Sequence, residues 1–101
     1  MNHDWKLNES IKKSKNLLVP WYLITSYGYY IKDFSILSDH RYDEMCKELS
    51  DGWDTINHRH KYIIDREALI SGSGFSINKN NYPSQIPGAF LSLAKEIGYE
   101  E

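Results

Sequence analysis

The clearest pattern of apolar and polar positions lies between residues 38 and 57. Apolar side chains recur there at spacings of three and four residues, at Tyr42, Met45, Cys46, Leu49, Trp53 and Ile56. Ser38 is a good helix N-cap, and Asp39 follows it where the helix dipole favours a negative charge. The pattern predicts an amphipathic helix over residues 38–57.

A second helix is predicted just before this one, over residues 21–33. Pro20 marks its start, because proline suits the first helical turn, where its missing N–H is not needed. Gly28 lies inside the segment, at a cost of roughly 1 kcal/mol relative to alanine. We therefore expect another element to pack closely against Gly28. A short connection would fold the two helices into an antiparallel hairpin.

The rest of the chain is less strongly patterned. Residues 1–16 are polar and predict an N-terminal arm or a short irregular helix, which leaves 17–101 as one small helical domain. Asp65 is a cap for a short helix over residues 66–70, and residues 87–97 predict a C-terminal helix that Gly98 would end. Ser71–Gly74 predicts a turn and 75–87 a loop. With no convincing strand alternation, the fold class is all-α.

Composition narrows the class of protein. A chain of 101 residues with 41% hydrophobic and 26% charged residues is typical of one soluble domain. No secretory signal or membrane-spanning run is visible, and Cys46 is the only cysteine, so we expect a cytoplasmic protein without an intramolecular disulfide. The net charge of −2 disfavours nucleic acid as a partner.

Aromatic residues make up 14% of the chain, and eight of them are tyrosines. Tyr29 and Tyr30 lie near the end of the first predicted helix. Asp39, Tyr42 and Asp43, at positions i, i+3 and i+4, share one face at the start of the second. If the hairpin brings these residues together, they form a site that can stack a flat ring on tyrosine and accept hydrogen bonds from ribose hydroxyls on aspartate.

This spacing resembles the N-terminal helical subdomain of bacterial NAD-dependent DNA ligases over residues 24–56. In that family the subdomain grips the nicotinamide mononucleotide (NMN) half of NAD during self-adenylation. The family pattern has a tyrosine-histidine pair, an aspartate ten residues after the tyrosine, and Tyr-Asp three residues later. Tyr29, Asp39, Tyr42 and Asp43 occupy the matching positions, and Tyr30 replaces the histidine. The resemblance implies a nucleotide-binding site made of these five residues, with NMN or NAD as the ligand.

The resemblance does not extend to catalysis. The chain has no Lys-x-Asp-Gly adenylation motif, and 101 residues cannot hold a nucleotidyltransferase core. Nothing supplies a complete nucleophile, base and oxyanion set, so we assign no catalytic residues. The chain is also similar to small uncharacterised proteins of tailed phages, through Pro-Trp-Tyr-Leu and His-x-His-Lys among other motifs. That similarity implies a phage or prophage protein acting inside a bacterial host.

Other interpretations of these residues stay open. The Tyr and Asp residues suit purely structural roles, since Tyr42 begins the apolar stripe and an aspartate after a serine cap is ordinary at a helix start. A second constellation, Asp54, His58 and His60, is a weak candidate for a metal site, and the competing role is a polar helix end. Cys46, inside the apolar stripe, is interpreted as a buried thiol.

Two functions follow from the sequence, and a third, hydrolysis of a bound nicotinamide nucleotide by Asp39 or Asp43, stays open without a complete catalytic set. The first is a non-catalytic binding protein whose hairpin holds NMN, NAD or a related nucleotide. The alternative is a viral interaction module, for host takeover or counter-defence, that presents its aromatic surface to a host or phage protein and has no small-molecule ligand. Trp5 and Trp21, together with the tyrosines, favour this alternative because they exceed what so small a core needs.

Overall fold

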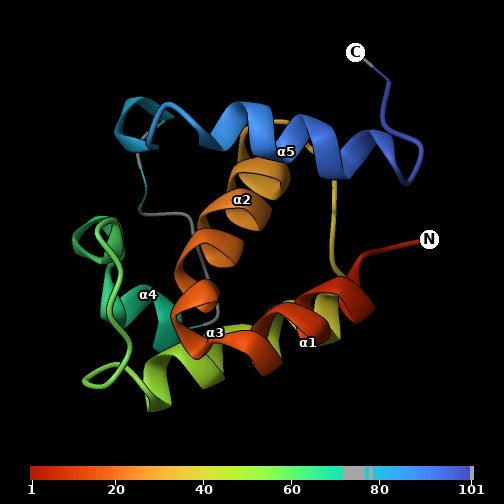
Figure 1. Cartoon of the computed structure of the whole chain (residues 1–101). Coiled ribbons are helices and arrows are strands. Elements are labelled where there is room, and N and C mark those ends of the chain that lie inside the picture. Colours follow the sequence, from red (N-terminus) through yellow and green to blue (C-terminus); the bar gives the residue numbers. More distant parts are fainter. Residues whose placement is uncertain (72–76, 78, 101) are drawn as a thin grey trace.

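The computed structural model describes residues 1–71, 77 and 79–100 of the chain (Figure 1). The regular secondary structure of the described part is all helical, as the sequence predicts. Its five α-helices are α1 (Asp4–Lys13), α2 (Leu18–Tyr30), α3 (Asp39–Asp51), α4 (Arg66–Ile70) and α5 (Ile86–Lys95). Three short 3-10 turns complete it, at Lys15–Leu17, Lys61–Ile63 and Lys79–Asn81.

Helix α2 is the central element of the fold. Figure 1 shows it rising from α1 and α3 at one end to α5 at the other. Every residue from Leu18 to Gly28 except Pro20 is buried. A helix that is apolar on all sides needs neighbours on all sides, and α2 packs against α3, α5 and the Lys15–Leu17 turn. The core therefore surrounds this single helix.

The predicted hairpin of two helices is present, with shorter bounds. Helix α2 begins at Leu18, before Pro20, and ends at Tyr30 rather than at residue 33. Helix α3 begins as predicted after Ser38, whose side chain accepts a hydrogen bond from the Arg41 N–H, but ends at Asp51 rather than at residue 57.

The apolar stripe of α3 outlasts the helix because the chain turns at Gly52. The Ile56 N–H donates to the Gly52 carbonyl at 2.9 Å. A Cβ at Gly52 would lie 3.1 Å from the Ile56 Cδ1 atom. Ile56 therefore folds back over the glycine and is buried by a turn. The apolar period therefore predicted correctly that Ile56 is buried, and predicted wrongly that the helix continues to residue 57.

Residues 1–16, expected to be an arm or a short irregular helix, contain the regular helix α1, which packs on the core. Leu7 is fully buried and His3 is buried. The His3 N–H donates to the Ile36 carbonyl at 2.8 Å, and the His3 ring contacts the Leu93 carbonyl at 2.9 Å. Both acceptors are backbone carbonyl groups of residues far away in the sequence. A pattern of apolar side chains cannot predict such hydrogen bonds.

The two last helices agree more closely with the sequence. Helix α4 spans the predicted residues, and the Asp65 side chain caps it by accepting from the Glu67 N–H at 2.9 Å. Helix α5 begins and ends slightly earlier than predicted, and Gly98 follows it with φ of 103°. The predicted turn at Ser71–Gly74 and the start of the predicted loop at 75–87 fall largely outside the described residues.

The close packing predicted at Gly28 is confirmed, where α5 crosses α2. A Cβ on Gly28 would lie 2.6 Å from the Phe90 ring and 2.8 Å from the Phe34 carbonyl oxygen. Only glycine fits at such distances. In the described part of the chain, no helix combines the length and apolar character that a membrane span requires.

Candidate functional site

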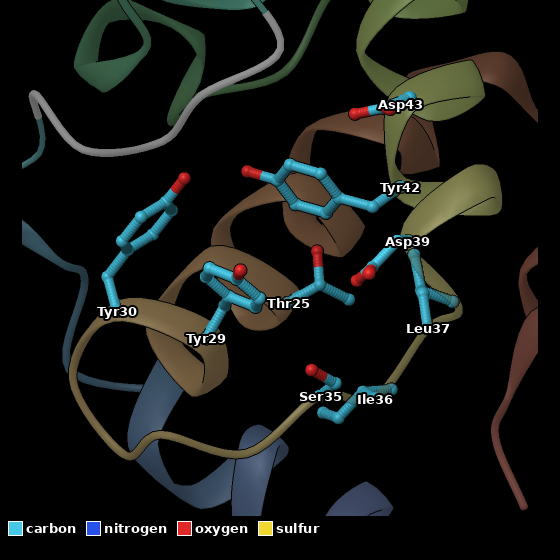
Figure 2. A pocket seen from close by; sticks show the side chains of 9 residues that line it. All are labelled: Thr25, Tyr29, Tyr30, Ser35, Ile36, Leu37, Asp39, Tyr42 and Asp43. Atoms are coloured by element: carbon cyan, nitrogen blue, oxygen red, sulfur yellow. The ribbon is translucent and has the colours of Figure 1, made fainter.

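A pocket of about 230 Å³ lies where the C-terminal end of α2, the connecting loop and the first turns of α3 meet (Figure 2). The five residues singled out from the sequence all line it. Its lining residues are Thr25, Tyr29, Tyr30, Ser35, Ile36, Leu37, Asp39, Tyr42 and Asp43. Helix α2 contributes one wall, α3 contributes the facing wall, and the loop closes one end.

Four lining residues were not predicted from the sequence. Thr25 lies one helical turn before Tyr29, and this i, i+4 spacing could have identified it. Ser35, Ile36 and Leu37 belong to the connecting loop, where Ile36 and Leu37 are buried. No sequence pattern marks a loop residue as pocket-lining, because its position depends on how the two helices meet.

The tyrosine rings of the pocket contact one another. The Tyr29 and Tyr42 rings are nearly parallel, with centroids 6.4 Å apart and an interplanar angle of 20°. Tyr30 meets Tyr29 edge-on at 4.9 Å. Behind the pocket, the Tyr22 ring stacks on Tyr42 at 6.2 Å. Tyr29 is 49% exposed, so part of its ring remains available to a ligand.

Tyr42 is anchored at its hydroxyl group. The Tyr42 hydroxyl lies 2.7 Å from the Ser26 Oγ atom on α2. Burial raises the pKa of Tyr42, and the neighbouring Tyr22 raises it further. Tyr42 is therefore a neutral phenol held in one orientation, and its ring rather than its hydroxyl is what it offers to a ligand.

Cys46, one turn further along α3, is fully buried, which confirms the sequence interpretation. Burial raises the pKa of the Cys46 thiol to about 12. Because the thiolate is the reactive form, Cys46 is inert at neutral pH and belongs to the core beneath the pocket.

The two carboxylates of the pocket, Asp39 and Asp43, are exposed. The arginine between them points away. Arg41 is buried, and its guanidinium donates to Asn8 Oδ1 on α1 and to Glu48 Oε2, both at 2.9 Å. The nine lining residues include no lysine or arginine, so the pocket is acidic.

Helix α1 holds the first turn of α3 in place. The Ser38 N–H and hydroxyl donate to the two Asp4 carboxylate oxygens, at 2.9 and 2.6 Å. Ser38 in turn accepts from the Arg41 N–H at 3.1 Å. Since Asp39 follows Ser38 directly, α1 helps set the position of a pocket carboxylate.

The arrangement suits binding. Tyrosine rings can stack on a flat group, and carboxylates can accept hydrogen bonds from hydroxyl groups. Among the lining residues there is no lysine, histidine or cysteine to form a covalent intermediate.

The second constellation is less organised. The His58 and His60 rings lie 5.4 Å apart, and the His60 N–H donates to His58 Nδ1 at 3.1 Å. Burial lowers the pKa of His58, and His60 and Arg59 lower it further. Asp54 is exposed. Over the described residues, no group of three or more His, Cys, Asp or Glu side chains is placed to hold a metal ion.

A second, shallower hollow of about 500 Å³ lies over the contact between α2 and α5. It contains none of the predicted site residues, and its charged lining residue is Lys32. The lining consists of Tyr27, Lys32, Pro87, Gly88, Phe90, Leu91 and Tyr99.

Comparisons with protein-family models, curated proteins and solved structures found no match. The resemblance to the ligase subdomain therefore rests on the sequence motif alone. The five residues of that motif all line the pocket between α2 and α3.

Proposed function

We propose that this chain is a small, non-catalytic protein that binds a nicotinamide nucleotide, NMN or NAD, in the pocket between α2 and α3. The observation that carries the proposal is that Tyr29, Tyr30, Asp39, Tyr42 and Asp43, chosen by spacing alone, line a single pocket. The hairpin brings the end of α2 close to the start of α3, and all five of these residues border the space between the two helices.

The pocket chemistry suits the nicotinamide riboside portion of such a ligand. In the proposed complex the flat nicotinamide ring stacks on Tyr29 and Tyr42, and the ribose hydroxyls donate to Asp39 and Asp43. The pocket volume of about 230 Å³ is below the 300–1,000 Å³ typical of sites for drug-sized ligands. The adenylate half of NAD therefore lies outside the pocket.

The proposal assigns binding rather than turnover. The ligase-like motif is present without the adenylation lysine. If the protein has the phage or prophage origin expected from its sequence, the binding takes place in the cytoplasm of an infected bacterium, where the protein would sequester or sense the nucleotide.

Calorimetric titration with NMN and with NAD tests the proposal. We expect saturable binding that Asp39→Ala with Asp43→Ala weakens at least tenfold. Asp51→Ala is the matched control, because Asp51 is an exposed aspartate at the far end of the same helix, and it should leave the affinity unchanged. Absence of heat at millimolar ligand, or equal affinity in the double variant, would contradict the proposal.

A specific observation favours the alternative function, a protein-interaction module. Trp5 is 61% exposed, Tyr62 is 82% exposed and Ile70 is 74% exposed, and large exposed apolar side chains are frequent anchors of interfaces. The expectation was wrong for Trp21, which is buried in the core because it lies on the central helix α2. Affinity capture from infected cells distinguishes the two functions. Under the alternative, one stoichiometric partner is lost in Trp5→Ala or Tyr62→Ala, and added NMN does not change its capture.

A further inference from the structure

The hollow over α2 and α5 has a size that suits a small ligand. Its volume of about 500 Å³ falls within the roughly 300–1,000 Å³ typical of small-molecule sites. Figure 1 shows α5 crossing the end of α2, where residues of both helices line the hollow. Gly88 lies on the α5 wall, and a Cβ atom added to it would meet nothing within 4 Å. The hollow therefore has room for a ring-sized group.

Three aromatic rings line the hollow. The Phe90 ring is buried, and it meets Tyr27 and Tyr99 edge-on, with centroids 5.6 and 5.1 Å apart. Leu91 adds an apolar side chain to the same lining. Aromatic rings favour edge-on or offset-stacked neighbours, and such pairs stabilise a complex beyond the area that they bury. A flat aromatic ligand would extend this cluster of rings.

The side chains around the hollow make it positive. The described residues that line it include one lysine, Lys32, and no aspartate or glutamate. Within the described part of the chain, the exposed Lys32 side chain forms no ion pair. Asp33 and Glu100 follow Lys32 and Tyr99 in the sequence, but neither lines the hollow. A ligand that enters the hollow therefore meets a cation without a carboxylate partner.

Two helix ends meet at the hollow, and they differ in how far the chain satisfies them. Gly88 lies in the first turn of α5, where the helix dipole is positive, and the N-cap residue Gln85 makes no side-chain cap bond. At the end of α2, the Tyr27 and Gly28 carbonyls accept from N–H groups of the residues that follow, at 2.9 to 3.2 Å. The start of α5 therefore adds to the positive potential of Lys32, and the satisfied carbonyls of α2 oppose it only weakly.

We propose that the hollow over α2 and α5 is a second ligand site, which takes a small planar aromatic carboxylate. The aromatic ring of the ligand lies against Tyr27, Phe90 and Tyr99, and its carboxylate pairs with the Lys32 ammonium group. Gly88 leaves the space that the ring occupies. This site is independent of the proposed nucleotide site, because the hollow and the pocket between α2 and α3 share no lining residue.

Amide NMR spectra recorded during titration with indole-3-acetate test the proposal. We expect saturable shifts at the amides of Lys32, Gly88 and Leu91, and none at Asp39 and Asp43 in the other pocket. Because the site is open to water, we expect half-saturation near about 1 mM. Absence of shifts at about 20 mM ligand, or shifts confined to Asp39 and Asp43, would overturn the proposal.

Two analogues of the probe separate the roles of charge and ring in the unaltered protein. Indole-3-acetamide keeps the shape and lacks the negative charge, so it should bind about three- to fivefold more weakly, the effect of one exposed ion pair. Cyclohexylacetate keeps the carboxylate and lacks the aromatic ring, and it should bind at least about threefold more weakly. Equal affinity of either analogue and indole-3-acetate would contradict the proposed recognition.

Lys32→Gln removes the proposed partner of the carboxylate. The variant should bind indole-3-acetate no more tightly than indole-3-acetamide, with the amide affinity unchanged from that of the unaltered protein. Lys95→Gln is the matched control, because Lys95 is an exposed lysine on α5 that does not line the hollow. It should retain the full preference for the acid. A preference that survives in Lys32→Gln would show that this lysine does not hold the carboxylate.

Gly88→Leu tests the shape of the site by placing a side chain where the ring is proposed to lie. We expect both indole ligands to bind at least about tenfold more weakly. Because Gly88 is exposed and its Cβ position is free, urea denaturation should show a stable fold. Undiminished binding in this variant would place the ligand elsewhere. If the variant is unfolded, the comparison of the three ligands on the unaltered protein decides the proposal.

Discussion

Helix α2 uses tyrosine differently on its two sides. Toward α5, Tyr27 packs edge-on against Phe90, with ring centroids 5.6 Å apart, and against Tyr82 at 5.3 Å. Phe34 and Tyr99 extend the same cluster. Toward α3, Tyr29, Tyr30 and Tyr42 instead border a pocket. Each side of α2 borders a hollow, but toward α5 the rings pack edge-on among other aromatic rings, whereas toward α3 they line a pocket together with two carboxylates.

The neighbours of the rings explain the difference. On the α5 side, Gly28 removes a side chain and lets Phe90 approach the α2 backbone. On the α3 side, Asp39 and Asp43 stand beside the rings. Burying a carboxylate without a partner is costly, and both aspartates are exposed to water at the edge of the pocket.

Alkaline pH should lower the free energy of unfolding more than any substitution considered below, and it should act through the α3 side of the core. Burial raises the pKa of Tyr22, Tyr42 and Cys46 above the unfolded values. Such groups stabilise the folded state fully below the unfolded pKa, and the stabilisation is lost as the pH rises. Each group lowers the free energy of unfolding by about 1.4 kcal/mol per pH unit, above roughly pH 8.5 for cysteine and roughly pH 10 for tyrosine. By pH 11 the sum exceeds about 5 kcal/mol.

Urea denaturation at pH 7, 9, 10 and 11 measures this loss. Cys46→Ala serves as the internal comparison, because it should move the onset from roughly pH 8.5 to roughly pH 10. A free energy of unfolding that stays constant up to pH 10.5 would show that these groups are not held neutral by the fold.

Phe90→Ala should have the next largest effect, through the α5 side. The Phe90 side chain is 1% exposed and contacts Tyr27, Phe34 and Tyr99. Its truncation leaves a cavity in the closed cluster, and we expect the free energy of unfolding to fall by about 3–5 kcal/mol. Thermal and urea denaturation check the value. A loss below about 1 kcal/mol would mean that this side of α2 is as loosely packed as the other.

Gly28→Ala adds one methyl group where α2 and α5 are in close contact. Its Cβ would meet the Phe90 ring and the Phe34 carbonyl at less than 3 Å, so we expect a loss of about 1–3 kcal/mol. Gly88→Ala is the matched control, since a Cβ there meets nothing within 4 Å. That variant should be neutral or stabilised by up to about 1 kcal/mol. Equal effects of the two substitutions on urea denaturation would refute the close contact.

Tyr29→Ala should have the smallest effect on stability, because its ring is half-exposed at the open side. We expect a change within about 0.5 kcal/mol in the free energy of unfolding. The same variant should weaken NMN binding about tenfold by removing a stacking face. If instead stability falls sharply and NMN affinity is unaltered, the tyrosine has a packing role, and the pocket is a consequence of packing rather than a site.

Several features of the fold follow from local sequence. The cap at Ser38 and the face shared by Asp39, Tyr42 and Asp43 depend on residues within one or two helical turns. The short helix α4 and its Asp65 cap are equally local, and both were predicted. Spacing along one helix determines such relations before any tertiary contact forms.

Other features depend on partners remote in the sequence. The bonds from Ser38 to Asp4 cross 34 residues, and the contact from His3 to Leu93 crosses 90. These bonds fix the N-terminal residues, which were not expected to belong to the domain, against the core as helix α1. The end of α3 was also misjudged, because an apolar period does not reveal whether Ile56 reaches the core by helix or by turn.

The sequence by itself determined which tyrosines and aspartates share a helix face, and the resemblance supplied a ligand for them. Only the tertiary structure decided that the two faces meet with space between them. Helix periodicity places side chains around an axis, but the separation of two helices is decided by what lies between them. Here the bond from Ser26 to Tyr42 fixes α2 against α3, and the Ile36–Leu37 loop and the exposed carboxylates border the space that remains.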